Sequence, residues 1–223
     1  MNKKLITNLS IGAAIVLTSF ASKAELTANF AAHSNYYWRG VTQTQNGAAL
    51  SGGIDYANDS GFYLGAWTSN VDFGEGGPSY ELDLYGGFSQ SIGDVSYDVG
   101  YLYYAYPDAA SDIDFGEVYG AVSWQWLSLQ VNYLTNADGD ASSEKDMLYT
   151  DLNASFDLSD KHSIAFHLGY SKGDTITEWF DEDSYLDYGV SWQTQGFTLG
   201  LVKTDLADDD LHMYVSYSLD FSL

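Results

Sequence analysis

The fold class is decided by the last thirteen residues, Leu211-His-Met-Tyr-Val-Ser-Tyr-Ser-Leu-Asp-Phe-Ser-Leu223. Seven apolar or aromatic side chains occupy every second position of this stretch, and polar residues with one tyrosine lie between them. Such alternation is typical of a β-strand that has one apolar face. The stretch therefore predicts a strand that runs up to the last residue. It also resembles the terminal-strand signal that the barrel-assembly machinery reads, although here the last residue is Leu rather than Phe.

The same alternation recurs along the chain and predicts twelve strands. We expect them near residues 26–40, 48–57, 61–71, 79–89, 95–106, 115–124, 127–134, 147–158, 162–171, 185–193, 197–203 and 211–223. Most are close to the roughly 9–11 residues of a tilted membrane-spanning strand, and longer than the roughly 5–6 residues of an ordinary soluble strand. The lengths favour an antiparallel transmembrane β-barrel.

The connections between these strands alternate in length. Long ones at 41–47, 72–78, 107–114, 135–146, 172–184 and 204–210 alternate with tight turns such as Asn58-Asp59-Ser60 and Ser159-Asp160. Short turns on one rim and long loops on the other are typical of outer-membrane barrels. We therefore expect short periplasmic turns, long extracellular loops, and both termini on the periplasmic side.

The first 24 residues have the pattern of a secretory signal peptide. Lys3 and Lys4 precede an apolar run over residues 5–20, and Ser22-Lys23-Ala24 has small residues at the positions of a cleavage site. A transmembrane anchor is the alternative, but the run is shorter than the roughly 20 residues that a spanning helix needs. We predict a signal peptide over 1–24 and an outer-membrane barrel over 25–223.

Composition excludes several classes of protein. The chain has 31 acidic and 8 basic residues, a net charge of -23 and no cysteine. It therefore has neither a disulfide scaffold nor a cysteine-ligated zinc site, and it lacks the Lys and Arg that bind nucleic acid. Six Trp, 19 Tyr and 11 Phe are too many for a disordered acidic chain.

Aromatic residues gather where the membrane interface would need them. Tyr36, Tyr37 and Trp38 stand at the end of the first predicted strand, residues 101–106 hold four tyrosines, and Trp124 and Trp126 flank a short turn. Amphipathic rings favour the level of the lipid headgroups. We interpret these groups as interfacial girdles rather than as the core of a β-sandwich.

Several stretches resemble the TorF-like porin family of proteobacterial outer-membrane proteins. They are Asn35-Tyr-Tyr-Trp-Arg-Gly-Val-Thr-Gln-Thr44, Gly53-Ile-Asp-Tyr56, Gly61-Phe-Tyr-Leu-Gly-Ala-Trp-Thr-Ser-Asn-Val-Asp-Phe73 and Glu81-Leu-Asp-Leu-Tyr-Gly-Gly-Phe88. The resemblance is specific over residues 33–88 and agrees in strand pattern over the rest of the chain. It implies a channel in the outer membrane, and it supplies no catalytic or binding residues.

No motif of a known catalytic or cofactor site occurs in the chain. It has no Gly-x-Ser-x-Gly elbow, no phosphate-binding loop and no helical pair of zinc-binding histidines. Asp138, Asp140 and Glu144 do not have the spacing of a calcium loop. We expect no enzyme activity, metal or cofactor. One alternative is an outer-membrane enzyme with a rim site near His33 and His212, on the first and last strands, and another is a soluble acidic periplasmic β-sandwich.

The polar faces of the strands predict an acidic lumen. If the apolar faces meet lipid, the residues that we expect to line a pore are Arg39, Asp55, Glu81, Asp83, Asp98, Glu117, Asp151 and Asp157. Acidic rings favour cations in a pore. Six tyrosines with the same inward parity indicate a narrow lumen, a constriction or a plug: Tyr37, Tyr85, Tyr104, Tyr119, Tyr149 and Tyr214. The sequence therefore predicts a porin-like channel for small hydrophilic solutes or ions, with a preference for cations and with membrane lipid and the barrel-assembly machinery as partners.

Overall fold

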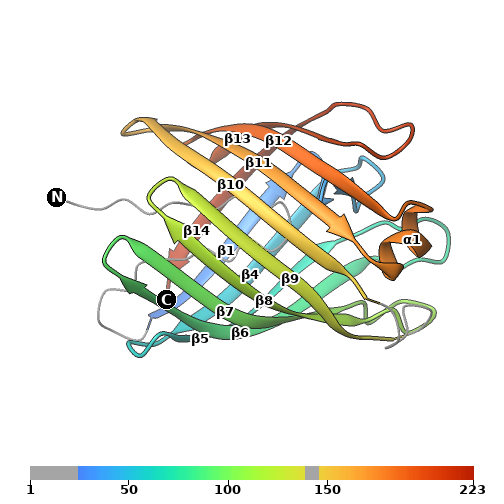
Figure 1. Ribbon diagram of the computed structural model, residues 1–223, viewed down its shortest axis with the longest axis horizontal. Coiled ribbons are helices and arrows are strands. Elements are labelled where there is room, and N and C mark those ends of the chain that lie inside the picture. Colours follow the sequence, from blue (N-terminus) through green and yellow to red (C-terminus); the bar gives the residue numbers. More distant parts are fainter. Residues whose placement is uncertain (1–24, 139–145) are drawn as a thin grey trace.

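The structure, a computed structural model, describes residues 25–138 and 146–223. These residues form a closed barrel in which every strand pairs antiparallel with its neighbours (Figure 1). The predicted signal peptide over 1–24, and Asp140 and Glu144 of the acidic loop, lie outside the described residues. The closed barrel confirms the predicted fold class, and the alternative of a soluble sandwich is wrong.

Twelve strands make the wall of the barrel. They are β1 (Glu25–His33), β4 (Ala49–Ala57), β5 (Phe62–Asn70), β6 (Tyr80–Ile92), β7 (Val95–Ala105), β8 (Phe115–Trp124), β9 (Leu127–Ala137), β10 (Leu148–Ser159), β11 (His162–Lys172), β12 (Ser184–Thr194), β13 (Phe197–Thr204) and β14 (His212–Ser222). Eleven of them agree with the predicted ranges to within three residues at each end.

The last strand closes the barrel on the first. β14 pairs with β1 in a register that runs from Thr27 opposite Ser222 to His33 opposite Ser216. Closure leaves no strand edge with unpaired backbone groups, which a bilayer would not tolerate. The C-terminus lies at the end of the barrel that carries the short turns, and the long loops lie at the other end (Figure 1).

The outer surface of the wall is apolar at alternate positions. Leu64 is 60% exposed, Val99 53% and Phe166 46%, and each lies between neighbours that face the interior. An apolar surface that runs round a whole barrel is typical of a lipid-facing belt. Within the described residues, no helix has the length and apolar character needed to cross a membrane.

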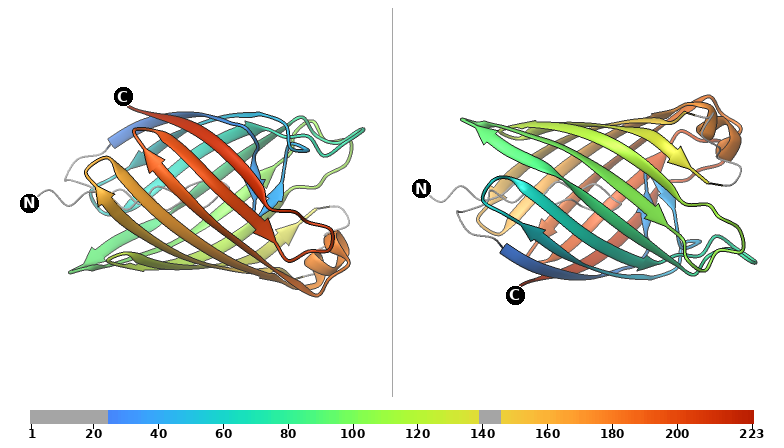
Figure 2. Two further views of the ribbon diagram at one scale, coloured as in Figure 1. Left: turned by 90° about the horizontal axis from the view of Figure 1, so that it is seen from above. Right: turned by 90° about the horizontal axis from the view of Figure 1, so that it is seen from below.

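The first predicted strand, over 26–40, is wrong in its second half. β1 ends at His33, and residues 34–48 then fold into the barrel, where β2 (Tyr37–Trp38) and β3 (Val41–Thr42) pair with each other. Figure 2 shows this pair between the walls, away from the strands of the barrel. We call residues 34–48 the inner hairpin.

A tight turn at its tip shapes the inner hairpin. Arg39 and Gly40 have φ angles of 50° and 81°, and they form a two-residue connection between β2 and β3. Positive φ at both central residues is the geometry of the type I′ turn, which suits the twist of paired strands. Gly40 is also required by space, because a Cβ atom there would lie 2.6 Å from Cβ of Asp187 on β12.

The hairpin also corrects the predicted aromatic girdle. Tyr36 and Tyr37 are buried inside the barrel rather than placed at its outer rim, and Trp38 lies beside them. Tyr104, from the tyrosine-rich end of β7, is likewise buried. Trp124 and Trp126 at the short-turn end are about half exposed, so the interfacial role of these two residues stays a prediction.

One short helix, α1 (Asp174–Phe180), lies in the long connection between β11 and β12, where the sequence pattern gave no helix. Ile176 of this helix is fully buried. Trp179 lies edge-on to Trp38 of the inner hairpin and to Phe115 of β8, with ring centroids 6.1 Å and 6.0 Å apart. The helix therefore packs against the inner hairpin from the long-loop end.

Candidate functional site

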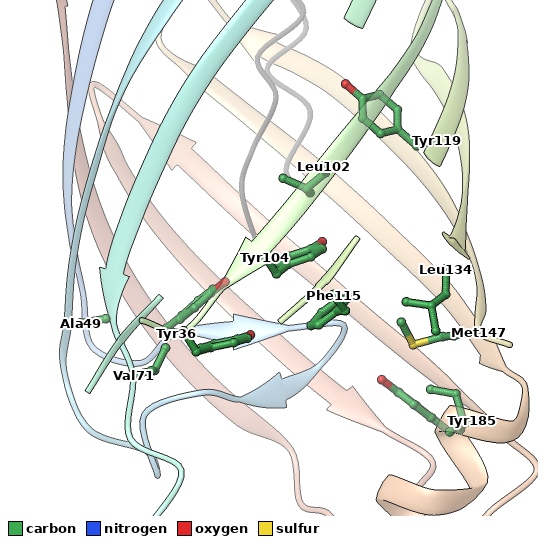
Figure 3. Close-up of a cluster of buried hydrophobic side chains, with 12 residues drawn as sticks. Tyr36, Ala49, Val71, Leu102, Tyr104, Phe115, Tyr119, Leu134, Met147 and Tyr185 are labelled. Atoms are coloured by element: carbon green, nitrogen blue, oxygen red, sulfur yellow. The ribbon is translucent and has the colours of Figure 1, made fainter. Parts of the chain in front are cut away.

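The inner hairpin contacts opposite walls of the barrel at once. Tyr36 packs edge-on against Trp67 of β5, with ring centroids 5.5 Å apart. Tyr37 packs against Tyr214 of β14 at 5.9 Å, while the tip approaches β12 at Asp187. Figure 3 shows Tyr36 between the walls together with inward-pointing residues of several strands. The hairpin thus lies across the lumen and narrows it.

Arg39 anchors the tip of the hairpin to the wall. Its Nη2 atom donates to both carboxylate oxygens of Glu117 on β8, at 2.7 Å and 2.6 Å. The guanidinium also lies over the rings of Trp38 and Tyr149, 4.2 Å and 4.3 Å from their centroids. The hydroxyl of Tyr185 donates to the backbone oxygen of Arg39 at 3.1 Å.

Burial alone would lower the pKa of Arg39, but the charge of Glu117 outweighs it and raises the pKa above its ordinary value. The guanidinium therefore stays charged, and both members of the pair are buried. Buried ion pairs are stable only where geometry and further hydrogen bonds compensate for the lost hydration. The two rings that face Arg39 add cation–π attraction.

Glu81 of β6 is a second anchor for the hairpin. The hydroxyl of Tyr36 donates to its Oε1 atom and that of Tyr106 to its Oε2 atom, each at 2.8 Å. Burial, followed by the charge of Glu81, raises the pKa values of both tyrosines. The two hydroxyls therefore stay protonated and hold the carboxylate from either side.

Asp83 lies two residues along β6 and shares the inward face with Glu81. Its side chain is fully buried, and neither carboxylate oxygen has a hydrogen-bond partner in the described part of the chain. Its cross-strand neighbours are Trp67 on β5 and Tyr104 on β7. Asp83 interacts electrostatically with Glu81 and Glu117, so three carboxylates from two strands gather beside the inner hairpin.

Other predicted lumen acids lie apart from this group, each with its own partner. Asp55 accepts from Tyr85 and, at 3.3 Å, from Asn29. Asp98 accepts from the hydroxyl of Tyr63 at 2.7 Å. Their burial places them on the interior side of the wall, while the lining of an open pore stays a prediction.

A histidine links the acids of the neighbouring strands. His167 on β11 lies with Nδ1 3.0 Å from Asp151 of β10, and its Nε2 contacts Asp187 of β12. This contact connects three adjacent strands on their inner face.

Asp157 differs from the other predicted lumen acids because it is exposed, near the short-turn end of the barrel. It lines a cavity of about 680 Å³ together with Trp126, Lys161, His162 and Asp220. This cavity lies on the side of the barrel that β10 to β14 form, whereas the inner hairpin crosses the lumen nearer the long loops.

The two histidines of the proposed enzyme alternative have separate partners. Nε2 of His33 lies 3.0 Å from the hydroxyl of Ser51, and Nε2 of His212 lies 3.0 Å from Asp209. Among the described residues, no group of three or more His, Cys, Asp or Glu side chains is arranged to hold a metal ion.

Sequence reasoning missed the aromatic part of this site. Trp38, Tyr149 and Tyr185 hold Arg39, and Tyr106 holds Glu81. Strand parity had placed Tyr149 on the inner face, but it gave no reason to pair this residue with Arg39. The one available signal was the Arg39-Gly40 dipeptide between short β-prone runs, which suits a hairpin turn.

Solved outer-membrane proteins have the same architecture. KdgM porin aligns with a TM-score of 0.53 at 10% identity, covering 88% of this chain and 99% of that chain. NanC porin gives a TM-score of 0.51 at 10% identity, with 89% and 98% covered. An outer membrane channel from Pseudomonas putida F1 gives 0.54 at 10% identity, with 91% and 97% covered. At these identities the likeness shows the fold.

Curated proteins include no significant match to this sequence. A protein-family model described as "Bacterial protein of unknown function (Gcw_chp)" matches residues 18–220, which is most of the chain. The chain therefore belongs to this family of bacterial proteins, Gcw_chp.

Proposed function

We propose that this protein is an outer-membrane channel for the passive diffusion of small hydrophilic solutes or ions, with a preference for cations. The observation that carries the proposal is a closed barrel with an apolar exterior, buried inward carboxylates and an inner hairpin across its lumen. A wall without strand edges and with an apolar belt suits a bilayer, and an acidic interior suits cations.

The balance of charge supports the preference for cations. Glu117 pairs with the guanidinium of Arg39, the only arginine in the chain, whereas neither Glu81 nor Asp83 has a cationic partner among the described residues. In a narrow lumen these charges are screened less than in bulk water, so their field acts strongly on a passing ion. KdgM porin has been solved in complex with disordered oligogalacturonate. The acidic lumen of the present barrel would repel an acidic saccharide of this kind.

The inner hairpin supports the proposal that the channel admits only small solutes. In a barrel of eight strands the side chains fill the interior, whereas barrels of sixteen strands leave an open channel. Twelve strands lie between these two cases, and the inner hairpin further reduces the free width of the lumen. The resemblance of residues 33–88 to the TorF-like porins is consistent with a channel. Secretion through the predicted signal peptide and insertion by the barrel-assembly machinery belong to the same proposal.

Liposome swelling tests the channel and its size limit together. Vesicles that contain the purified protein are diluted into isotonic solutions of glycerol, arabinose, sucrose and raffinose. We expect swelling with glycerol, slower swelling with arabinose, and none with raffinose. Protein-free vesicles give the baseline. Equal rates for sucrose and glycerol would contradict a narrow lumen, and rates at the baseline for every solute would contradict the channel.

A further inference from the structure

Asp83 is a buried carboxylate without a counter-charge of its own. Its two carboxylate oxygens have no partner in the described part of the chain, and its side chain is fully buried. The two acids nearest to it are already engaged, Glu81 by two tyrosine hydroxyls and Glu117 by Arg39. An ionised group in this position is costly unless a positive charge or a donor meets it.

Aromatic rings flank Asp83 on both sides. In the register of the barrel it lies directly between Trp67 of β5 and Tyr104 of β7. Residues opposite each other on neighbouring strands have Cβ atoms roughly 4.5–5.5 Å apart, so all three side chains share one patch of the inner wall. Tyr36 of the inner hairpin packs against Trp67 and also interacts electrostatically with Asp83. The patch therefore combines a carboxylate that has no hydrogen-bond partner with aromatic side chains.

The neighbouring Arg39 shows which chemistry such a patch holds. Its guanidinium lies on the carboxylate of Glu117 and against the rings of Trp38 and Tyr149. The Asp83 patch repeats this combination of one carboxylate and aromatic rings, but no cationic side chain of the described residues pairs with it. A soluble cation with a weakly hydrated, organic head would complete it in the same way.

We propose that Asp83, Trp67 and Tyr104 form a binding site for an organic ammonium cation, at the constriction that the inner hairpin makes. The proposal deepens the proposed function, since it names the class of solute that the channel takes. The aromatic walls favour an organic ammonium head over a strongly hydrated inorganic ion. Because the hairpin encloses Asp83, we expect the cation to enter when the hairpin shifts.

Binding to the purified, folded protein in a neutral maltoside detergent tests this site. Choline is titrated while tryptophan fluorescence is followed, and 3,3-dimethylbutan-1-ol serves as the uncharged probe of the same shape. We expect saturable quenching by choline and none by the alcohol. Asp83→Asn should weaken choline binding by about tenfold or more, since it removes a charged partner. Trp67→Leu should weaken choline binding as well, because it removes one ring.

Asp108→Asn is the matched control, because it removes the same charge from an exposed position in a long loop. It should bind choline as the parent protein does. Heat-modifiable gel mobility shows whether Asp83→Asn folds. If it does not fold, two other measurements test the site: choline binding by Trp67→Leu, and the displacement of choline by K⁺ in the parent protein. Equal affinity for choline and the alcohol, undiminished binding in both variants, or displacement by equimolar K⁺ would overturn the site.

Conductance of the same preparations separates this inference from the proposed function. A barrel that conducts ions but does not bind choline would overturn the ammonium site and leave the channel. A barrel that binds choline at Asp83 but conducts nothing would overturn the channel and leave the site.

Discussion

Among single residues, Arg39 holds the inner hairpin in the position that narrows the lumen. It is the only arginine in the chain, and its buried contacts tie the tip of the inner hairpin to β8 and β10. The sequence pattern places Arg39 near the end of the first predicted strand, over 26–40, among the acids expected to line the lumen. Arg39 does pair with a carboxylate, that of Glu117, but it projects from the inner hairpin instead of from a strand of the wall.

Replacing Arg39 by alanine should both destabilise the barrel and open its lumen. Glu117 would lose its cationic partner and keep only the hydrogen bonds from Tyr104 and Asn132, and breaking a buried ion pair in this way typically costs about 3–5 kcal/mol of unfolding free energy. We expect a lower urea midpoint, a higher single-channel conductance, and a preference for cations that does not reverse. Lys172→Ala removes an exposed cation at the end of β11 and is the control. A conductance equal to that of the parent protein would show that the Arg39 contact does not narrow the lumen.

Residue parity predicted which acids face inward, because a strand exposes alternate side chains to opposite sides. Asp55, Asp83 and Asp98 illustrate this, since all three lie on the interior side of their strands. Parity carries no information about contacts between strands that are not neighbours. The meeting of Glu81 on β6 with Tyr36 of the hairpin therefore had no signal in the local pattern.

At the scale of elements, the inner hairpin is the feature that the sequence pattern did not separate. The run from residue 34 to 42 is rich in β-prone aromatic residues, and it reads as a continuation of β1. Long-range packing decides otherwise, because Tyr37 meets Tyr214 and Arg39 meets Glu117 inside the barrel. Turn chemistry at Arg39-Gly40 permits the reversal, and the tertiary contacts fix its direction.

Gly40→Ala should displace the inner hairpin from the wall. The new Cβ would meet Asp187 at 2.6 Å and Thr204 at 2.7 Å, and the positive φ would be strained as well. Overpacking of this kind typically costs about 1–3 kcal/mol beyond the strain of the turn. We expect larger and noisier single-channel currents, measured in planar bilayers.

Gly93→Ala isolates the strain of the turn from the clash with the wall. Gly93 also has a positive φ, of 64°, but an added Cβ there would meet no atom within 4 Å. The strain of the turn should cost Gly93→Ala about 1–2 kcal/mol of unfolding free energy, as it does in Gly40→Ala, but the single-channel currents should not change. Identical currents in Gly40→Ala and the parent protein would show that the position of the inner hairpin does not affect conductance.

The last strand should be required for membrane insertion. Deleting residues 219–223 removes the pairs from Leu219 opposite Phe30 to Ser222 opposite Thr27, and it exposes an edge of β1. We expect the truncated protein to be absent from outer-membrane fractions and to lose its heat-modifiable gel mobility. Phe221→Leu keeps the apolar alternation and should insert normally. Insertion of the truncated chain at the parent level would contradict this requirement.

At the scale of the whole molecule, the barrel follows from periodicity in the sequence. Alternation along each strand and alternation between long and short connections predicted the strand number, the antiparallel order and the closure of β1 on β14. These features depend on local pattern and on the lack of a tolerable strand edge in a bilayer. The interior depends on contacts between distant segments, and for the interior the pattern predicted a set of inward acids and tyrosines but not how they pair.

The reversal potential under a KCl gradient shows whether this acidic, narrowed barrel conducts cations. The parent protein is placed in a planar bilayer with tenfold more KCl on one side. We expect the current to reverse at a potential of the sign for K⁺ selectivity, with a larger preference for K⁺ at lower ionic strength, where screening is weaker. Selectivity for chloride would contradict the preference for cations, and a folded barrel that conducts no current would contradict the channel.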